Sequence, residues 1–333
     1  MPRKRLPVWL FVLPVLVLVG CLVHLAIGGG SSQLNLVNIV PNLLRGNVGG
    51  DNANIILWQI RIPRTLAALL AGGVLGAVGA VFQAFFRNPL AEPYVIGVSS
   101  GAGFGGTVAV VLGLTQAAHT LGVVGLAFLG GLGSLWMVMA LARRRGGLQV
   151  HTLLLAGVVV GAMLSAMMTT VLMMGGFDTG KVLKWLLGSL TPVFPERLWA
   201  MAVVLVVGLL VLQTQTRSLN AFSVSEFTSE RLGVDTARLR TVVLLAGTAM
   251  VSVVVGSVGV IGFLGLMAPH IARRLVGLDL RYSLVASAFV GSLLLLFSDL
   301  VAQNLHEGIE VPVGAVTALL GAPALLWLLK KEG

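Results

Sequence analysis

Few side chains in this sequence could carry out chemistry, and they lie far apart along the chain. Among its 333 residues are only 12 acidic residues, 5 histidines and a single cysteine, Cys21. An enzyme site needs acids, histidines or nucleophiles that converge on one cavity, and a cysteine metal site needs several cysteines. The histidines are spread along the chain, at His24, His119, His151, His270 and His306. We therefore expect no catalytic residue, no bound metal and no cofactor.

Two short motifs are similar to catalytic sequences but lack a required part. Gly175–Lys181 has the glycine and lysine spacing of a phosphate-binding loop. The next residue, Val182, has no hydroxyl for magnesium, and no predicted strand precedes the motif. His306 and Glu307 lack the second histidine of a metalloprotease helix. The chain is therefore predicted not to be an enzyme and to have no ATPase site of its own.

The composition is that of a membrane protein. Hydrophobic residues make up 57% of the chain and charged residues only 10%, which is outside the range of soluble domains. A membrane span needs roughly 20 apolar residues, and about ten such segments can be placed in one all-α transmembrane domain, residues 1–333. The predicted spans are 8–27, 65–86, 94–113, 120–142, 151–174, 196–212, 241–258, a short one at 259–271, 283–302 and 312–329. The short span is interrupted by glycine, so a broken helix and a re-entrant segment are both open.

The net charge of +10 reflects topology rather than a nucleic-acid partner. If the N-terminus is cytoplasmic, most of the 22 Lys and Arg residues fall on the cytoplasmic side of these spans, as the positive-inside rule requires. Both termini are then cytoplasmic. We expect a multi-pass protein of a bacterial cytoplasmic (inner) membrane that contacts lipid and no nucleic acid.

The segment from Trp58 to Gly103 combines charged, small and helix-breaking residues. Arg61 and Arg64 flank a proline at its start, where a charge stays hydrated only at the membrane surface or in a vestibule. Gly72 and Gly76 are four residues apart, and such spacing lets a neighbouring helix approach closely. The helix is then expected to break at RNPLAEP, residues 87–93.

These motifs resemble those of the FecCD family, the permease subunits of ABC importers that carry iron chelates, haem and cobalamin. The matching residues are RIPR at 61–64, RNPLAEP at 87–93 and GVSSGA at 97–102, and further matches extend to Leu329. The resemblance implies a second copy of the chain, two ABC ATPase subunits and a periplasmic or lipid-anchored binding protein as partners. It also implies that Arg61 and Arg64 dock the binding protein. Members of the family often have an arginine near position 303, where this chain has Gln303.

The polar segment 214–240 is expected to be a cytoplasmic loop with a short helix inside it. Ser225 precedes Glu226 as a helix cap, and Gly233 after Leu232 is a typical helix end. The pattern is similar to the coupling segment that docks in a groove of the ATPase in ABC importers. This resemblance assigns Ser225, Glu226, Leu232 and Gly233 to ATPase coupling. A solvated loop of mixed charge is the alternative.

Three further features leave alternatives open. Met163 and Met167 lie on a methionine-rich span, and Met163, Met167, Gly72 and Gly76 are candidates either for a transport pathway or for helix packing. Asp299 is an acid at expected membrane depth, so it is either functional or part of a buried pair. Pro269 is expected to end or kink its helix, and the neighbouring His270 is either a ligand or a structural histidine.

The resemblance implies an ATP-driven importer that takes up a metal chelate from an external binding protein. Ferric siderophore is the expected cargo because it is the broadest substrate class of the family, with cobalamin and haem as alternatives. A secondary transporter driven by an ion gradient is a more remote alternative. Such proteins carry charged or broken-helix ion sites at the midplane, and Asp299 is the one acid available, off centre.

Overall fold

The computed structural model describes residues 8–28, 52–114, 120–144, 147–174, 179–191, 193–305 and 311–332. The described chain is almost entirely helical, apart from one two-residue antiparallel pairing in which Arg143 lies opposite Leu148. In these residues, seven helices are long and apolar enough to cross a membrane, and shorter apolar helices accompany them. The prediction of a polytopic all-α fold is confirmed.

The elements follow one another along the chain with short connections. Their bounds are α1 Trp9–Ile27, α3 Asn52–Ile55, the π-helical η1 Ile56–Arg61, α4 Ile62–Phe86, α5 Val98–Val111, α6 Thr120–Ala142, β1 Arg143–Arg144, β2 Gly147–Leu148, α7 Val150–Met174, α8 Thr179–Leu186, α9 Pro195–Val224, α10 Glu226–Arg231, α11 Thr236–Val258, α12 Leu264–Val276, α13 Leu280–Asn304 and α14 Val313–Glu332.

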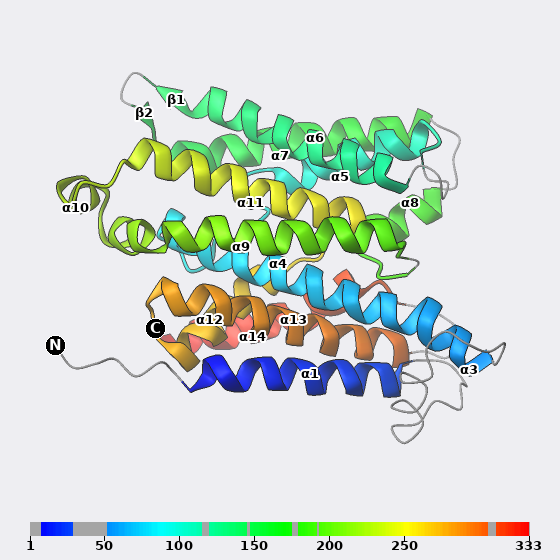
Figure 1. The fold of residues 1–333 in the computed structure, drawn as a ribbon. Coiled ribbons are helices and arrows are strands. Elements are labelled where there is room, and N and C mark those ends of the chain that lie inside the picture. Colours follow the sequence, from blue (N-terminus) through cyan, green and yellow to red (C-terminus); the bar gives the residue numbers. More distant parts are fainter. Residues whose placement is uncertain are drawn as a thin grey trace.

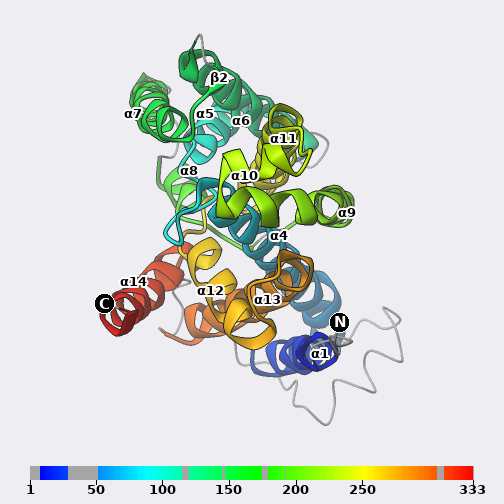
Figure 2. The ribbon, with the colours of Figure 1, turned by 90° about the vertical axis from the view of Figure 1, so that its left-hand side faces the viewer.

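Helix α4 forms the centre of the bundle. In the view along the bundle, α5, α6, α7 and α11 lie on one side of α4, and α12, α13, α14 and α1 lie on the other (Figure 2). In the most apolar stretch of the η1–α4 helix 83% of residues are buried, against 17% in α9. The exposed surface of the peripheral helices is mainly apolar, as expected for a face in contact with lipid.

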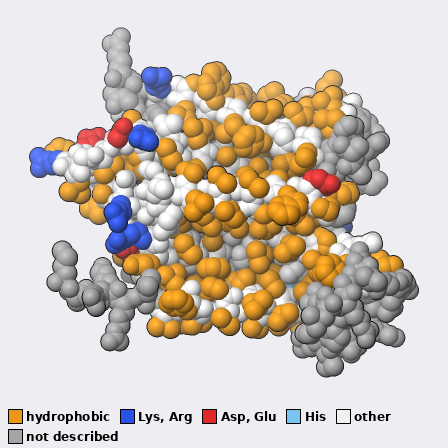
Figure 3. Space-filling view, viewed as in Figure 1, with side chains coloured by type: hydrophobic (Ala, Val, Ile, Leu, Met, Phe, Trp, Pro, Cys, Tyr) orange, Lys and Arg blue, Asp and Glu red, His pale blue; other side chains and the backbone are white. Residues whose placement is uncertain are grey.

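The two ends of the bundle differ in composition. One end carries α10, the β1–β2 pairing, the start of α1 and the end of α14 (Figure 1). Lys and Arg side chains gather at this end, and a broad hydrophobic band occupies the middle of the same face (Figure 3). We call it the basic end, and its arginines include Arg87, Arg143, Arg231, Arg240, Arg273, Arg274 and Arg281. The opposite end carries α3 and α8 (Figure 1).

The second span begins earlier than its sequence predicted. Residues 52–61, predicted as loop or membrane surface, are helical and continue directly into α4. Pro63 has no N–H, so the α-helical bonding pattern cannot pass through it. The preceding turn is π-helical instead, with the N–H of Ile62 bonded to the carbonyl of Leu57.

The polar segment 214–240 is mostly helix rather than loop. Helix α9 continues to Val224, so the predicted span 196–212 is too short. Helix α11 already begins at Thr236. The polar residues of 214–224 therefore extend a peripheral helix beyond its apolar part, and only the short α10 and its flanking turns separate α9 from α11.

The predicted short span 259–271 is a broken helix. Helix α11 ends at Val258, residues 259–263 are non-helical, and α12 begins at Leu264. Pro269 does not end α12, which continues to Val276. Proline at 269 cannot bond to the carbonyl of Gly265. The side-chain amide of Gln83 on α4 donates to that carbonyl over 3.2 Å, which offsets the missing backbone bond.

Candidate functional site

A buried polar network joins α1, α4 and α13 near the opposite end. Arg64 donates from Nε and from a terminal nitrogen to the two carboxylate oxygens of Asp299, each over 2.7 Å. Gln303 donates to the same carboxylate over 2.7 Å, and the His24 ring lies 2.9 Å from it. Asp299 is 0% exposed. Of the two readings of this acid, the structure supports the buried pair.

Arg61 belongs to the same end but contacts different groups. One terminal nitrogen donates to the Leu25 carbonyl over 2.6 Å, and the other donates to the Gly28 carbonyl over 2.7 Å. These carbonyls lie at the C-terminus of α1, where a cation is favoured by the helix dipole. Arg61 is 5% exposed and Arg64 is 9% exposed. The expectation of hydrated arginines at this end is therefore wrong, and both guanidinium groups hold helices together.

Sequence reasoning missed three members of this network. His24, Thr65 and Gln303 are drawn in by Asp299 and Arg64, and the His24 ring also lies 2.8 Å from the Thr65 hydroxyl. His24 and Asp299 are 275 positions apart in the chain, so no local spacing could indicate the contact. The one available signal was that a histidine, two arginines and an acid all fell on predicted spans close to the same membrane face.

At the basic end, the predicted short helix is present as α10. The Ser225 side chain accepts a hydrogen bond from the Thr228 N–H, as a helix cap does. Gly233 has a φ of 78°, a conformation that glycine adopts without strain. Glu226 accepts a hydrogen bond from Arg240 of α11. Phe227 and Leu232 are exposed, so α10 presents apolar side chains at a polar end of the molecule.

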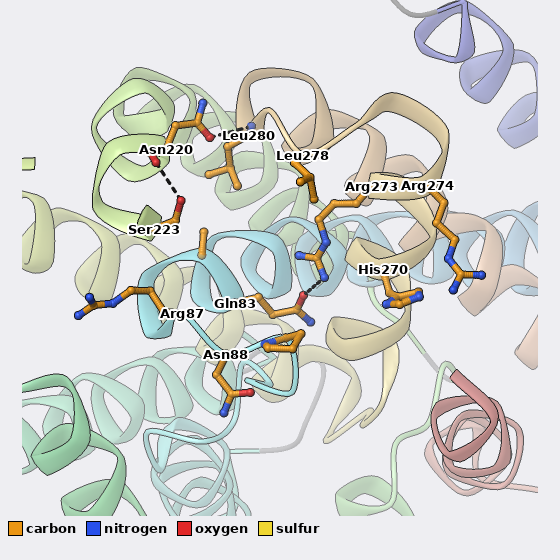
Figure 4. A pocket seen from close by; sticks show the side chains of 12 residues that line it. Gln83, Arg87, Asn88, Asn220, Ser223, His270, Arg273, Arg274, Leu278 and Leu280 are labelled. Carbon is orange, nitrogen blue, oxygen red and sulfur yellow. Dashed lines mark hydrogen bonds between the residues drawn. The ribbon is translucent and has the colours of Figure 1, made fainter. Parts of the chain in front are cut away.

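A polar cavity opens beside these elements at the basic end. It has a volume of about 520 Å³ and is lined by the end of α4, the last turns of α9, α12 and the start of α13. Arg273 donates to the Gln83 side chain over 2.7 Å, and Arg87 and Arg274 point to opposite sides of the cavity (Figure 4). His270 also lines it. The arginines diverge, so the cavity does not form a compact site for one small anion.

The small-residue positions of α4 are helix contacts. A Cβ atom added at Gly72 would overlap the carbonyl of Gly291, and one added at Gly76 would overlap the carbonyl of Ser287. Both partners lie on α13, so α4 and α13 pack backbone to backbone. Met163 and Met167, by contrast, are exposed on α7. They do not pack inside this chain.

Some predicted features lie outside the described residues or concern metal ligands. Residues 175–178 of the phosphate-loop-like motif, together with His306 and Glu307, are not among the described residues. Within the described ranges, no group of three or more His, Cys, Asp or Glu residues could hold a metal ion.

Comparison with known proteins identifies the family of this bundle. The model of the FecCD transport family matches residues 16–331. The chain belongs to the FecCD transport family. This FecCD chain is 39% identical over 327 residues to the vitamin B12 import system permease protein BtuC of Escherichia coli O6:H1, covering 98% of the chain and 95% of that protein. It is also 39% identical over 332 residues to BtuC of Salmonella typhi, covering 99% and 97% of the two proteins.

Solved structures agree with this assignment. The FecCD chain superposes with a TM-score of 0.83 on an inward-facing metal-chelate type ABC transporter, at 30% identity, over 97% of this chain and 98% of that one. PsaBC from Streptococcus pneumoniae in complex with Fab has a TM-score of 0.59 at 16% identity, over 86% of this chain and 94% of that one; this likeness shows the fold alone. The FecCD chain is thus a membrane permease of the ABC transporter class.

Proposed function

We propose that this chain is the permease subunit of an ATP-driven importer that takes up a metal chelate from an external binding protein. Two copies form the central pathway in a bacterial cytoplasmic membrane, and two separate ATPase subunits supply the energy. The basic end lies in the cytoplasm, which follows the positive-inside rule. Met163 and Met167 are exposed on α7, and we assign them to the pathway between the copies.

The observation that carries this proposal is α10. It is a short, capped helix between two long helices, with Phe227 and Leu232 exposed at an otherwise polar end. An exposed apolar helix face is suited to a groove in a partner protein. The salt bridge from Glu226 to Arg240 ties α10 to α11. Movement of α10 by the ATPase would therefore be transmitted into the bundle.

The binding protein is proposed to dock at the opposite end. Arg61 and Arg64 support this surface by fixing α1 and α13 to α4, through the α1 carbonyls and Asp299. Replacing each arginine with glutamine tests their part. If both variants lose carrier binding but keep the thermal stability of the wild type, the guanidinium groups contact the carrier directly. A parallel loss of binding and stability supports a positioning role.

Cobalamin is the cargo that we propose first. The relatives at 39% identity are named as vitamin B12 permeases and match over nearly the whole chain. Ferric siderophore, expected from the breadth of the family, and haem remain the alternatives within the same class of importer.

ATP hydrolysis in liposomes tests the proposal. The chain is co-purified with the ATPase encoded beside it and reconstituted with the neighbouring binding protein, loaded with cobalamin, ferric siderophore or haem in turn. We expect one loaded carrier to stimulate hydrolysis and its cargo to enter the liposomes. Uptake that persists without ATP and stops when the proton gradient is collapsed would instead show a secondary transporter.

A further inference from the structure

A groove lies between α6 and α11 at the basic end, apart from α10 and from the polar cavity. It has a volume of about 700 Å³, which is within the range of ligand sites. The last turns of α6 and the first turns of α11 form its walls, and these two helices lie side by side at this end (Figure 1). The residues that matter here are Trp136, Met139, Arg143, Ala237 and Arg240.

The groove changes character along its length. Arg143 follows directly after the end of α6 and is exposed. Trp136 lies seven residues earlier, or about 10 Å along the helix axis, and is 72% exposed. Exposed apolar residues surround it, including Leu141 on α6 and Leu245 on α11. A tryptophan and an arginine in this order mark the boundary between hydrocarbon and headgroups.

Arg240 adds a second cation with unused bonding capacity. It is only 8% exposed, and one terminal nitrogen donates to Glu226. Its Nε–H is buried and has no hydrogen-bond partner in the part of the chain that the structure describes. A buried donor without an acceptor is unfavourable. Because Glu226 balances the charge of Arg240, the positive charge of Arg143 remains in excess at the groove.

We propose that this groove binds one anionic phospholipid, with its phosphate held by Arg143 and Arg240 and its acyl chains along Trp136 and Met139. Basic pockets between transmembrane helices on the cytoplasmic side suit such headgroups. The small side chain of Ala237 leaves room for the glycerol. Since Arg240 also holds Glu226, the bound phosphate is linked to α10 through a single side chain. The inference rests on the proposed function only for placing the basic end at the cytoplasmic leaflet.

Lipid binding to the purified full chain tests this site without regard to cargo or orientation. The delipidated protein in detergent is titrated with phosphatidylglycerol or with phosphatidylcholine of the same acyl chains, and bound lipid is counted by native mass spectrometry. We expect phosphatidylglycerol to bind more tightly than phosphatidylcholine. Arg143→Gln is expected to weaken phosphatidylglycerol binding about fivefold, the effect of one basic residue near an anionic headgroup.

Two further variants separate the groove from general effects of charge. Arg217→Gln removes an exposed arginine of α9 that does not line the groove, and its lipid binding is expected to match the wild type. Ala237→Phe fills the groove without changing its charge and is expected to abolish the preference. Equal losses in Arg143→Gln and Arg217→Gln, or no loss in either, would overturn the proposal. Full competition by glycerol phosphate would also overturn it, because the site would then bind a soluble anion.

Discussion

Two arginine–carboxylate pairs of equal length lie at opposite ends of the bundle. Arg64 and Asp299 are 2.7 Å apart in the network that joins α1, α4 and α13. Arg281 and Asp279 are also 2.7 Å apart, in the turn between α12 and α13 at the basic end. The Asp299 side chain is fully buried, whereas the side chains of Asp279 and Arg281 are 21% and 43% exposed.

This difference teaches that burial, not distance, decides what each pair contributes. An exposed pair is screened by water and gains little. A buried pair costs much to desolvate, and removing one partner leaves the other charge uncompensated. Asp299 also links residues from three helices, while Asp279 pairs with a residue two positions away. We therefore assign long-range architecture to the opposite end and local, movable structure to the basic end.

The largest expected effect is that of Asp299→Asn. Loss of this charge leaves Arg64 and His24 without their common acceptor, and the cost for a buried pair is about 3–5 kcal/mol of unfolding free energy. Denaturant unfolding in detergent measures it. Glu196→Gln, at an exposed position in the first turn of α9, is the matched control and should be near neutral. A double variant, Arg64→Met with Asp299→Leu, should recover part of the loss. If Asp299→Asn is as stable as Glu196→Gln, the network is not architectural.

Gly76→Leu should be the next most harmful change. Any Cβ at this position overlaps the Ser287 carbonyl, so α4 and α13 must separate, at a cost of about 1–3 kcal/mol. The same unfolding assay measures it. Gly133→Ala, on α6 where an added Cβ meets nothing within 4 Å, is the control and should be stabilising. An unchanged stability for Gly76→Leu would contradict the close approach of the two helices.

Ser225→Ala tests the local character of the basic end. Loss of the cap should destabilise α10 by about 1 kcal/mol without lowering the stability of the whole bundle. Hydrogen exchange of residues 226–231 is expected to accelerate, while that of α4 is unchanged. Ser225→Asp keeps a capping oxygen and should restore the wild-type rate. Faster exchange throughout the protein would show that α10 is not an independent local unit.

The smallest effect concerns Asp279 and depends on pH. Its hydrogen bonds with Arg281 lower the pKa of Asp279 from 3.8 to about 2. The pair therefore stabilises the folded state at pH values above 3.8, and this contribution is lost as the pH falls toward 2. Because the pair is partly exposed, we expect about 1 kcal/mol at most. Asp279→Asn keeps a capping side chain for α13, so comparing its acid unfolding with that of the wild type isolates the charge. A larger loss than in Asp299→Asn would reverse the comparison between the two ends.

Local features of the fold and site could be predicted from the sequence, and long-range contacts could not. The span 120–142 and the cap at Ser225 depend on apolar runs and neighbouring residues, and α6 and α10 appear as predicted. The partners of Asp299 come from three helices, and their positions follow only from packing. The early start of the second span was missed because its first residues are polar and pass through a π-helical turn.

Photo-crosslinking in the assembled transporter tests the central claim most directly. A photoreactive residue replaces exposed Phe227 on α10 in one sample and exposed Ile60, near the opposite end, in another. The account predicts that position 227 crosslinks to the ATPase and position 60 to the binding protein. Crosslinks of position 227 to the binding protein, or of position 60 to the ATPase, would contradict the assignment of the two ends.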